Sequence, residues 1–273
     1  MPELPEVEVL KLSLEPRLVG RRIESVEVRD RRLRVPIARG FARDVAGRRI
    51  EGLRRRSKYL LIDLEGGKTL VIHLGMSGRL TVSKAAAPPE DHEHLAFRLD
   101  RGLRLRFRDP RRFGLAAVID TDAIESNVHF RGLGIEPLSE AFDGATLAGL
   151  ARGRRGPVKS FLMDGRLVVG VGNIYATEAL WRAHIHPTRS VARIARARWD
   201  ALAAAVVEVL THAIREGGTT LNDFADGSGN AGEFQIALAA YDREGEPCPR
   251  CGTAIRRIVQ SGRSTYYCPV CQR

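Results

Sequence analysis

The first residues of the chain place a secondary amine next to carboxyl groups. The sequence opens with MPELPEVE, so Pro2 follows the initiator methionine and Glu3 follows Pro2. A small residue in second place permits removal of the methionine, and the free α-amino group of Pro2 then titrates near neutrality. Such an amine can be uncharged and act as a nucleophile that forms a covalent iminium. The alternative is that Pro2 only starts a helix, whose positive N-terminus the acids favour.

The four cysteines form two close pairs, Cys248 with Cys251 and Cys268 with Cys271, separated by sixteen residues. This spacing is typical of a four-thiolate zinc site, because each Cys-x-x-Cys turn supplies two sulfurs. The stretches 255–258 and 264–267 predict a hairpin between the pairs. Disulfides are the alternative, which a reducing compartment disfavours. We expect one structural zinc, since four protein ligands leave no position for water.

Basic residues dominate the composition, with 44 Lys and Arg against 33 Asp and Glu and a net charge of +11. Residues 17–58 alone hold fifteen basic residues against five acids. A surface of this kind attracts polyanions, and nucleic acid is the first candidate, with solubility as the alternative. Lysine is rare, which suggests positions where an ammonium that can change protonation state is needed. The five lysines are Lys11, Lys58, Lys68, Lys84 and Lys159.

The length of 273 residues favours two domains and a small appendage. The chain has no run of 18 or more apolar residues, and its first eight residues hold three acids and no apolar signal core. We therefore expect neither membrane insertion nor secretion, and a cytoplasmic location.

Residue patterns in the first half predict one helix followed by strands. Apolar residues at helical spacing predict a helix over residues 3–14, with Pro16 marking its end. Two hairpins follow, 59–64 with 69–74 and 95–99 with 103–108. In the last strand, Leu103, Leu105 and Phe107 alternate with arginines. We expect a mainly β half with one apolar and one cationic face.

The second half of the chain is predicted to be helical, after a change in residue composition between residues 132 and 150. Short helices are predicted near 157–163 and over 173–183, joined by a Gly-rich turn. A longer helix is predicted from Arg189 to Glu216, ending at Gly217 and Gly218. Residues 217–235, rich in Gly, Asn, Asp and Ser, predict a mobile loop.

The motifs taken together resemble those of the bacterial formamidopyrimidine-DNA glycosylases over the whole chain. They are the opening residues, the segments 56–59, 73–78, 109–114 and 170–176, and the cysteine pairs. The resemblance implies an α+β multidomain fold. Its parts are an N-terminal β-sandwich with a flanking helix (1–131), a linker (132–150), a helix-two-turns-helix DNA-binding domain (151–237) with a lesion loop (217–235), and a β-hairpin zinc finger (238–273).

The resemblance also implies an activity, which is removal of oxidised purines from DNA followed by strand cleavage. Pro2 would attack the anomeric carbon and displace the damaged base, leaving a Schiff base that undergoes β,δ-elimination. Glu3 would donate a proton to the sugar ring, with Glu6 in support. Lys58 would act as a general acid or phosphate contact, and Arg263 would contact DNA and assist elimination.

The partner implied is double-stranded damaged DNA, bound by a monomer. Extrusion of a base leaves a hole in the duplex, which Met76, Arg111 and Phe113 would fill. Asn173 starts a helix, where free backbone N–H groups suit a phosphate. Three further positions match DNA contacts of the family, and they are His92, Arg154 and Lys159.

Two departures from the family pattern bear on lesion preference. The loop reads Ala-Gly-Glu-Phe at 231–234 where an aromatic pair is common, and Asp242 replaces the usual glycine after Tyr241, a supporting residue. Two other functions stay open at this point. One is the sister group of glycosylases that acts on oxidised pyrimidines, and the other is a non-catalytic zinc-finger DNA binder.

Overall fold

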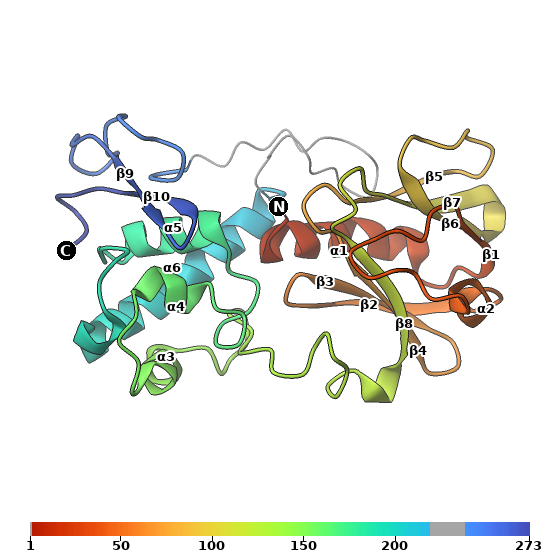
Figure 1. The fold of residues 1–273 in the computed structure, drawn as a ribbon, viewed down its shortest axis with the longest axis horizontal. Coiled ribbons are helices and arrows are strands. Elements are labelled where there is room, and N and C mark those ends of the chain that lie inside the picture. Colours follow the sequence, from red (N-terminus) through yellow and green to blue (C-terminus); the bar gives the residue numbers. More distant parts are fainter. Residues whose placement is uncertain (1, 219–237) are drawn as a thin grey trace. The chain divides into compact units, whose positions relative to one another are not determined.

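The computed structural model describes residues 2–218 and 238–273 and divides them into two compact units (Figure 1). The first unit contains the described residues up to Arg131 together with residues 216–218. The second contains residues 132–215 and 238–273. Met1 lies outside the described residues, and so does the expected loop 217–235 apart from Gly217 and Gly218.

The first unit is the expected β-sandwich of two four-stranded antiparallel sheets (Figure 1). One sheet has the order β1 (Ile23–Val28), β6 (Glu93–Leu99), β7 (Leu103–Arg108) and β5 (Arg79–Lys84). The other has the order β2 (Ile50–Arg56), β3 (Tyr59–Leu64), β4 (Lys68–His73) and β8 (Leu115–Asp120). Apolar side chains from both sheets share one core. Short segments α2 (Phe41–Val45), η1 (Asp100–Gly102) and η2 (Thr121–Ala123) complete the unit.

Both predicted hairpins are confirmed. Strand β3 pairs with β4 from Tyr59 opposite His73 to Leu64 opposite Lys68, one residue earlier in β4 than expected. Strand β6 pairs with β7 around the η1 turn. These strands form where the sequence alternates or concentrates apolar residues, because such patterns match a pleated, half-buried surface.

The arginines of the second hairpin do not form an exposed cationic face, so that prediction is wrong. Arg104 and Arg106 are buried. Arg104 donates to Glu27 at 3.0 Å and Arg106 donates to Glu90 at 3.0 Å. The buried Glu93 carboxylate lies 3.8 and 3.6 Å from the two guanidinium groups. The face is internally neutralised because a buried unpaired charge is costly.

Helix α1 (Leu4–Leu18) packs against β2, β3 and β5 (Figure 1). Its side chains Leu10, Leu14 and Leu18 are fully buried in the sandwich core. The predicted end before Pro16 is wrong, since Pro16 lies inside the helix. A proline in the last turn removes one backbone hydrogen bond, and burial of Leu18 favours continuing the helix past it.

The second unit is helical with a terminal hairpin. The predicted helices near 157–163 and 173–183 are confirmed as α4 (Val158–Leu162) and α5 (Asn173–Arg182). The long helix α6 (Arg196–Arg215) begins seven residues after the predicted start at Arg189. Residues 189–195 do not belong to the helix. Ser190 instead forms a backbone bridge with Pro157, and the residues that follow it form the 3₁₀ turn η3 (Val191–Arg193). The expected linker 132–150 contains most of helix α3 (Gly144–Ala151).

The C-terminal hairpin consists of β9 (Arg256–Gln260) and β10 (Arg263–Tyr267), as the sequence predicted. Its two-residue turn has Ser261 at φ 51° and Gly262 at φ 71°, the left-handed conformation that tight hairpin turns require. Across residues 2–218 and 238–273, none of the helices combines the length and the apolar character needed to cross a membrane.

Asp242 stands in the left-handed region at φ 62°, which explains why glycine is usual at this position. Its carboxylate accepts a hydrogen bond from the Tyr266 hydroxyl at 3.0 Å. Burial, followed by this carboxylate, raises the pKa of Tyr266 above its ordinary value. The hydrogen bond offsets the backbone strain of a non-glycine residue.

Two substitutions separate these contributions. Asp242→Ala removes the hydrogen bond and keeps the strained φ, so we expect the free energy of unfolding to fall by about 1–3 kcal/mol. Asp242→Gly removes both the hydrogen bond and the backbone strain. We therefore expect its free energy of unfolding to fall by about 1 kcal/mol less than that of Asp242→Ala. Urea unfolding followed by the fluorescence of Trp181 and Trp199, both in this unit, measures the difference. Equal losses would refute the strain argument.

Candidate functional site

The candidate nucleophile sits at the start of α1. Pro2 is buried, and Glu3 is the N-cap residue with only 3% of its surface exposed. The Glu6 carboxylate accepts a hydrogen bond from the Glu3 backbone N–H at 2.7 Å, and the two residues form a capping box. Gly218 lies against the same carboxyl group, since a Cβ built there would be 3.4 Å from Glu6 Oε1. The first turn of the helix is therefore tightly held.

Lys58 occupies the two-residue turn that joins β2 to β3. Its neighbour Ser57 has φ 55°, which the tight turn requires. Burial, assisted by the positive charges of Lys58 and Arg34, lowers the pKa of His73 to about 4. His73 Nδ1 accepts a hydrogen bond from the Gly75 N–H at 2.9 Å. The side chain is thus a neutral acceptor at physiological pH.

Other rare lysines have simpler roles. Lys11 donates to Glu8 at 2.6 Å, and Lys68 donates to Asp120 at 2.5 Å. Burial alone would raise the pKa of Glu8, but hydrogen bonds from Lys11 and Arg55 outweigh it and lower that pKa. These lysines serve ion pairs, which do not require a change of protonation state.

The structure brings together the two segments that carry Met76, Arg111 and Phe113. Gly75 has φ 64°, and a Cβ at this position would lie 2.4 Å from the Phe113 carbonyl carbon, so only glycine permits the approach. The Arg111 guanidinium lies over the Phe113 ring, 5.0 Å from its centroid. Phe113 is 45% exposed and does not belong to the core of the sandwich.

His92 lies beside the same segment. It is exposed and has φ 62°. Its carbonyl oxygen accepts a hydrogen bond from the Asp109 N–H at 3.0 Å. Four of the sequence-predicted site residues are therefore grouped at one end of the sandwich sheets, and they are Met76, His92, Arg111 and Phe113.

In the second unit, Lys159 and Asn173 form one network with the C-terminal hairpin. Lys159 is only 2% exposed, and its Nζ donates to Asn173 Oδ1 at 2.6 Å and to Thr265 Oγ1 at 2.8 Å. Asn173 Nδ2 donates to the Ser264 carbonyl at 3.0 Å. The ammonium thus joins helices α4 and α5 to β10. A direct DNA contact by Lys159 stays a prediction.

Arg154 and Arg263 are exposed, as expected of DNA contacts. Arg154 lies between α3 and α4 and donates through Nε to the Leu150 carbonyl at 3.0 Å. Arg263 begins β10 next to the hairpin turn. With Lys159, it lines a cavity of about 280 Å³ whose other walls come from α4 and the hairpin turn.

Tyr241 belongs to the segment that follows the undescribed residues. Its ring packs edge-on against Tyr266 with centroids 5.3 Å apart. The backbone N–H groups of Ala239, Ala240 and Tyr241 donate to the buried Glu178 carboxylate at 2.8 to 2.9 Å. Glu178 in α5 therefore anchors this segment. Glu178 is not among the residues predicted from the sequence, although an acid among the apolar residues of this helix was the signal that marked it.

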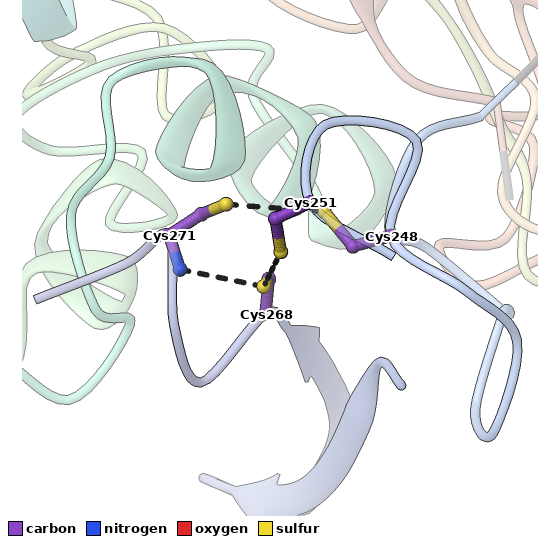
Figure 2. A group of neighbouring side chains, drawn as sticks. All are labelled: Cys248, Cys251, Cys268 and Cys271. Atoms are coloured by element: carbon purple, nitrogen blue, oxygen red, sulfur yellow. Dashed lines mark hydrogen bonds between the residues drawn. The ribbon is translucent and has the colours of Figure 1, made fainter. Parts of the chain in front are cut away.

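The four cysteines converge, as Figure 2 shows. Their sulfurs all lie within 4.8 Å of one another. The Cys248 and Cys271 sulfurs are 4.0 Å apart and the Cys251 and Cys268 sulfurs are 3.5 Å apart. Tetrahedral zinc with Zn–S bonds of about 2.3 Å needs sulfurs separated by about 3.8 Å. The donor set and its geometry fit zinc.

Outer contacts orient the thiols. Trp181 Nε1 donates to Cys248 Sγ at 3.4 Å. The Cys271 N–H donates to Cys268 Sγ at 3.3 Å (Figure 2). The buried Gln272 accepts from the Cys268 N–H at 2.8 Å and donates to the Ile185 carbonyl at 3.0 Å. Such N–H···S bonds stabilise thiolate ligands. The finger is thereby fixed to the end of α5.

Three domain families match the chain in order. The formamidopyrimidine-DNA glycosylase N-terminal domain matches residues 1–116, and the formamidopyrimidine-DNA glycosylase H2TH domain matches residues 133–225. A zinc finger found in FPG and IleRS matches residues 245–273. The sandwich, the helices and the four-cysteine hairpin together define a DNA glycosylase with a zinc finger.

Relatives of the same length support one family. The formamidopyrimidine-DNA glycosylases of Methylococcus capsulatus and Acidithiobacillus ferrooxidans are 48% and 50% identical over 273 residues, with 100% of each chain covered. Lactococcus lactis Fpg, solved with THF-DNA and an inhibitor, superposes with a TM-score of 0.91 at 35% identity, and 100% of both chains is covered. The chain belongs to the formamidopyrimidine-DNA glycosylase family, a family of base-excision-repair enzymes.

Removal of the zinc tests the structural role of the metal. We expect a strong chelator to release one zinc per chain, change the fluorescence of Trp181 and abolish tight binding of duplex DNA, because structural zinc supplies folding free energy. Metal analysis, fluorescence and a binding titration follow the three events, and added zinc reverses them. Unchanged fluorescence and DNA affinity in the metal-free protein would contradict the assignment.

Proposed function

We propose that the chain is a bifunctional DNA glycosylase and lyase that removes oxidised purines from duplex DNA through the amine of Pro2. The substrate class is 8-oxoguanine and ring-opened formamidopyrimidines. The observation that carries the proposal is a buried Pro2 and Glu3 at the start of a capped helix, in a chain that belongs to this family. A DNA binder without chemistry has no use for such a group.

The proposed reaction proceeds in two stages. The lone pair of the Pro2 nitrogen forms a bond to C1′, the electron pair of the glycosidic bond leaves with the base, and the base takes up the proton that the nitrogen loses. Glu3 protonates the sugar ring oxygen, the ring opens, and an iminium remains between C1′ and Pro2. Loss of a C2′ proton then breaks the C3′–O3′ bond and cuts the strand. In a second elimination, loss of a C4′ proton breaks the bond from C5′ to its phosphate oxygen.

Residues around the amine have supporting roles in this proposal. Glu6 holds the first turn of α1 by its hydrogen bond to the Glu3 N–H. Lys58 acts as general acid or phosphate contact, and its place in a tight turn supports a fixed position. Arg263 assists the elimination, which its exposure at the hairpin turn supports. Tyr241 supports the segment after the lesion loop.

DNA binding falls to both units in the proposal. Met76, Arg111 and Phe113 fill the hole left by the extruded base, and the exposure of Phe113 and its packing with Arg111 support this. Asn173 binds a phosphate at the N-terminus of α5. Further contacts come from His92, Arg154 and Lys159. We propose the partition into a catalytic sandwich (1–131), a linker (132–150), a DNA-binding domain (151–237) and a zinc finger (238–273).

The working state proposed is a monomer acting on chromosomal DNA in the cytoplasm. The net charge of +11 supports a polyanionic partner. The solved complexes of Lactococcus lactis Fpg contain damaged DNA, including DNA with an abasic site.

Borohydride trapping tests the covalent step. Reduction of the iminium should join the native chain to a duplex that carries an oxidised purine, and mass spectrometry should place the bond on Pro2. A variant that retains one extra residue before Pro2 should give no trapped complex, because an amide nitrogen is not nucleophilic. Its affinity for the duplex, measured by titration, should persist.

The same experiment decides between an enzyme and a non-catalytic zinc-finger binder. Binding without trapping by the native chain, once its N-terminus is shown to be Pro2, would leave only the binder. Trapping by the extended variant would move the nucleophile to another residue.

Lesion preference separates the purine branch from its sister group. We expect faster single-turnover excision of 8-oxoguanine and formamidopyrimidines than of oxidised pyrimidines, because the Met76, Arg111 and Phe113 set matches the purine branch. Binding alone does not decide, since Lactococcus lactis Fpg has been solved with DNA that contains an oxidised pyrimidine. Faster excision of the pyrimidine lesion would assign the chain to the sister group.

A further inference from the structure

The segment of residues 109–114, here called the 109–114 loop, is held by a buried carboxylate. Asp109 is fully buried. Its Oδ1 accepts from the Ser77 hydroxyl at 2.7 Å, and its Oδ2 accepts from the Gly114 N–H at 2.7 Å. Ser77 also accepts from the Arg111 N–H at 3.2 Å. These bonds fix the shape of the loop that carries Arg111 and Phe113, and the Asp109 N–H also donates to the His92 carbonyl beside β6 at 3.0 Å.

His94, in β6, adds an attachment of the loop through its side chain. Its side chain is only 2% exposed, with Nε2 3.0 Å from the Asp109 carbonyl oxygen and Nδ1 3.1 Å from the Asp30 carbonyl oxygen. The ring therefore bridges the 109–114 loop and the segment that follows β1. The Asp30 carboxylate contacts Arg112 of the same loop at 3.3 Å. The 109–114 loop and the segment after β1 are thus joined at two points of the loop, Asp109 and Arg112.

A β-bulge in β6 sets the direction of the His94 ring. Glu93 pairs with Arg108 and Leu95 pairs with Phe107, so His94 is an extra residue in β6 without a partner of its own in β7. Its carbonyl oxygen instead accepts from the Arg29 N–H at 2.9 Å. Bulges of this kind redirect one side chain, and they occur often beside functional sites. Because of the bulge, the His94 imidazole lies at a position that a side chain of a regular strand would not occupy.

Both partners of the ring are carbonyl oxygens, which only accept hydrogen bonds. Each ring nitrogen of His94 therefore faces an acceptor, one on the loop and one on the segment that follows β1.

We propose that His94 is a positioning residue that holds the 109–114 loop, and with it Arg111 and Phe113, through the contact of its Nε2 with the Asp109 carbonyl. The inference rests on the proposed function, in which these two side chains fill the hole left by the extruded base. His94 touches neither the amine nor the reacting sugar in that mechanism. It acts on base extrusion through the loop.

Two substitutions form a matched pair. In His94→Gln the amide nitrogen takes the place of Nε2 and keeps the bond to Asp109 of the loop. In His94→Asn it takes the place of Nδ1 and keeps only the bond to Asp30. Both variants are neutral and polar and lose one of the two bonds, so comparison of the two isolates the attachment of the loop.

The readouts are single-turnover excision of 8-oxoguanine and incision of a duplex with a preformed abasic site. We expect excision by His94→Asn to be about fivefold slower than by His94→Gln, which corresponds to the loss of one neutral hydrogen bond. Abasic-site incision should be similar in the two variants, because no base has to be extruded. Equal excision rates, or an equal loss of abasic-site incision, would overturn the proposal.

Nitrogen-15 spectra of the native chain test the attachment directly. The Nε2 atom of His94 should carry a proton that is hydrogen-bonded to the Asp109 carbonyl, with the signals assigned by their loss in His94→Gln. An Nε2 atom without a proton would overturn the proposal. If the native chain excises no oxidised purine, the proposed function fails, whereas excision by the native chain with no difference between the two variants refutes only the role of His94.

Discussion

A reactive amine at a chain terminus needs an ordered terminus, and termini are usually the least ordered residues of a domain. Here the constraint is met by the capping box in the first helical turn, in which the Glu3 N–H donates to the Glu6 carboxylate at 2.7 Å. Burial of Leu4 and Leu10 fixes the helix itself in the sandwich core. Because the peptide next to Pro2 is held in this way, the direction of the amine follows from the packing of α1.

Buried polar side chains organise the remaining functional segments. Asp109 closes the 109–114 loop, Glu178 gathers three backbone N–H groups, and Lys159 joins two helices to the terminal hairpin. Each group would be costly to bury alone, and each is satisfied by partners far away in the sequence. The same groups that satisfy their own hydrogen-bonding needs therefore set the positions of exposed residues such as Phe113 and Arg263.

The excess of arginine has two different uses. Arg104 and Arg106 are paired inside the first unit with glutamates, although their alternation with leucine suggested an exposed cationic face. Arg154 and Arg263 stay exposed. The composition gives the total charge of the chain. The carboxylates that folding places beside the arginines determine which of these charges are available to a polyanion.

The sequence by itself determined the zinc ligands, both hairpins of the sandwich and the helices α4 and α5, because these depend on spacing within short segments. Tertiary structure alone decided the late start of α6, the burial of Lys159 and the roles of Glu178 and His94. Each of these depends on hydrogen bonds between segments far apart in the chain, such as Asp30 with His94 and Asp109. Local patterns carry no record of such partners, and the backbone N–H and carbonyl groups that bind Glu178 and His94 are the same in nearly every residue.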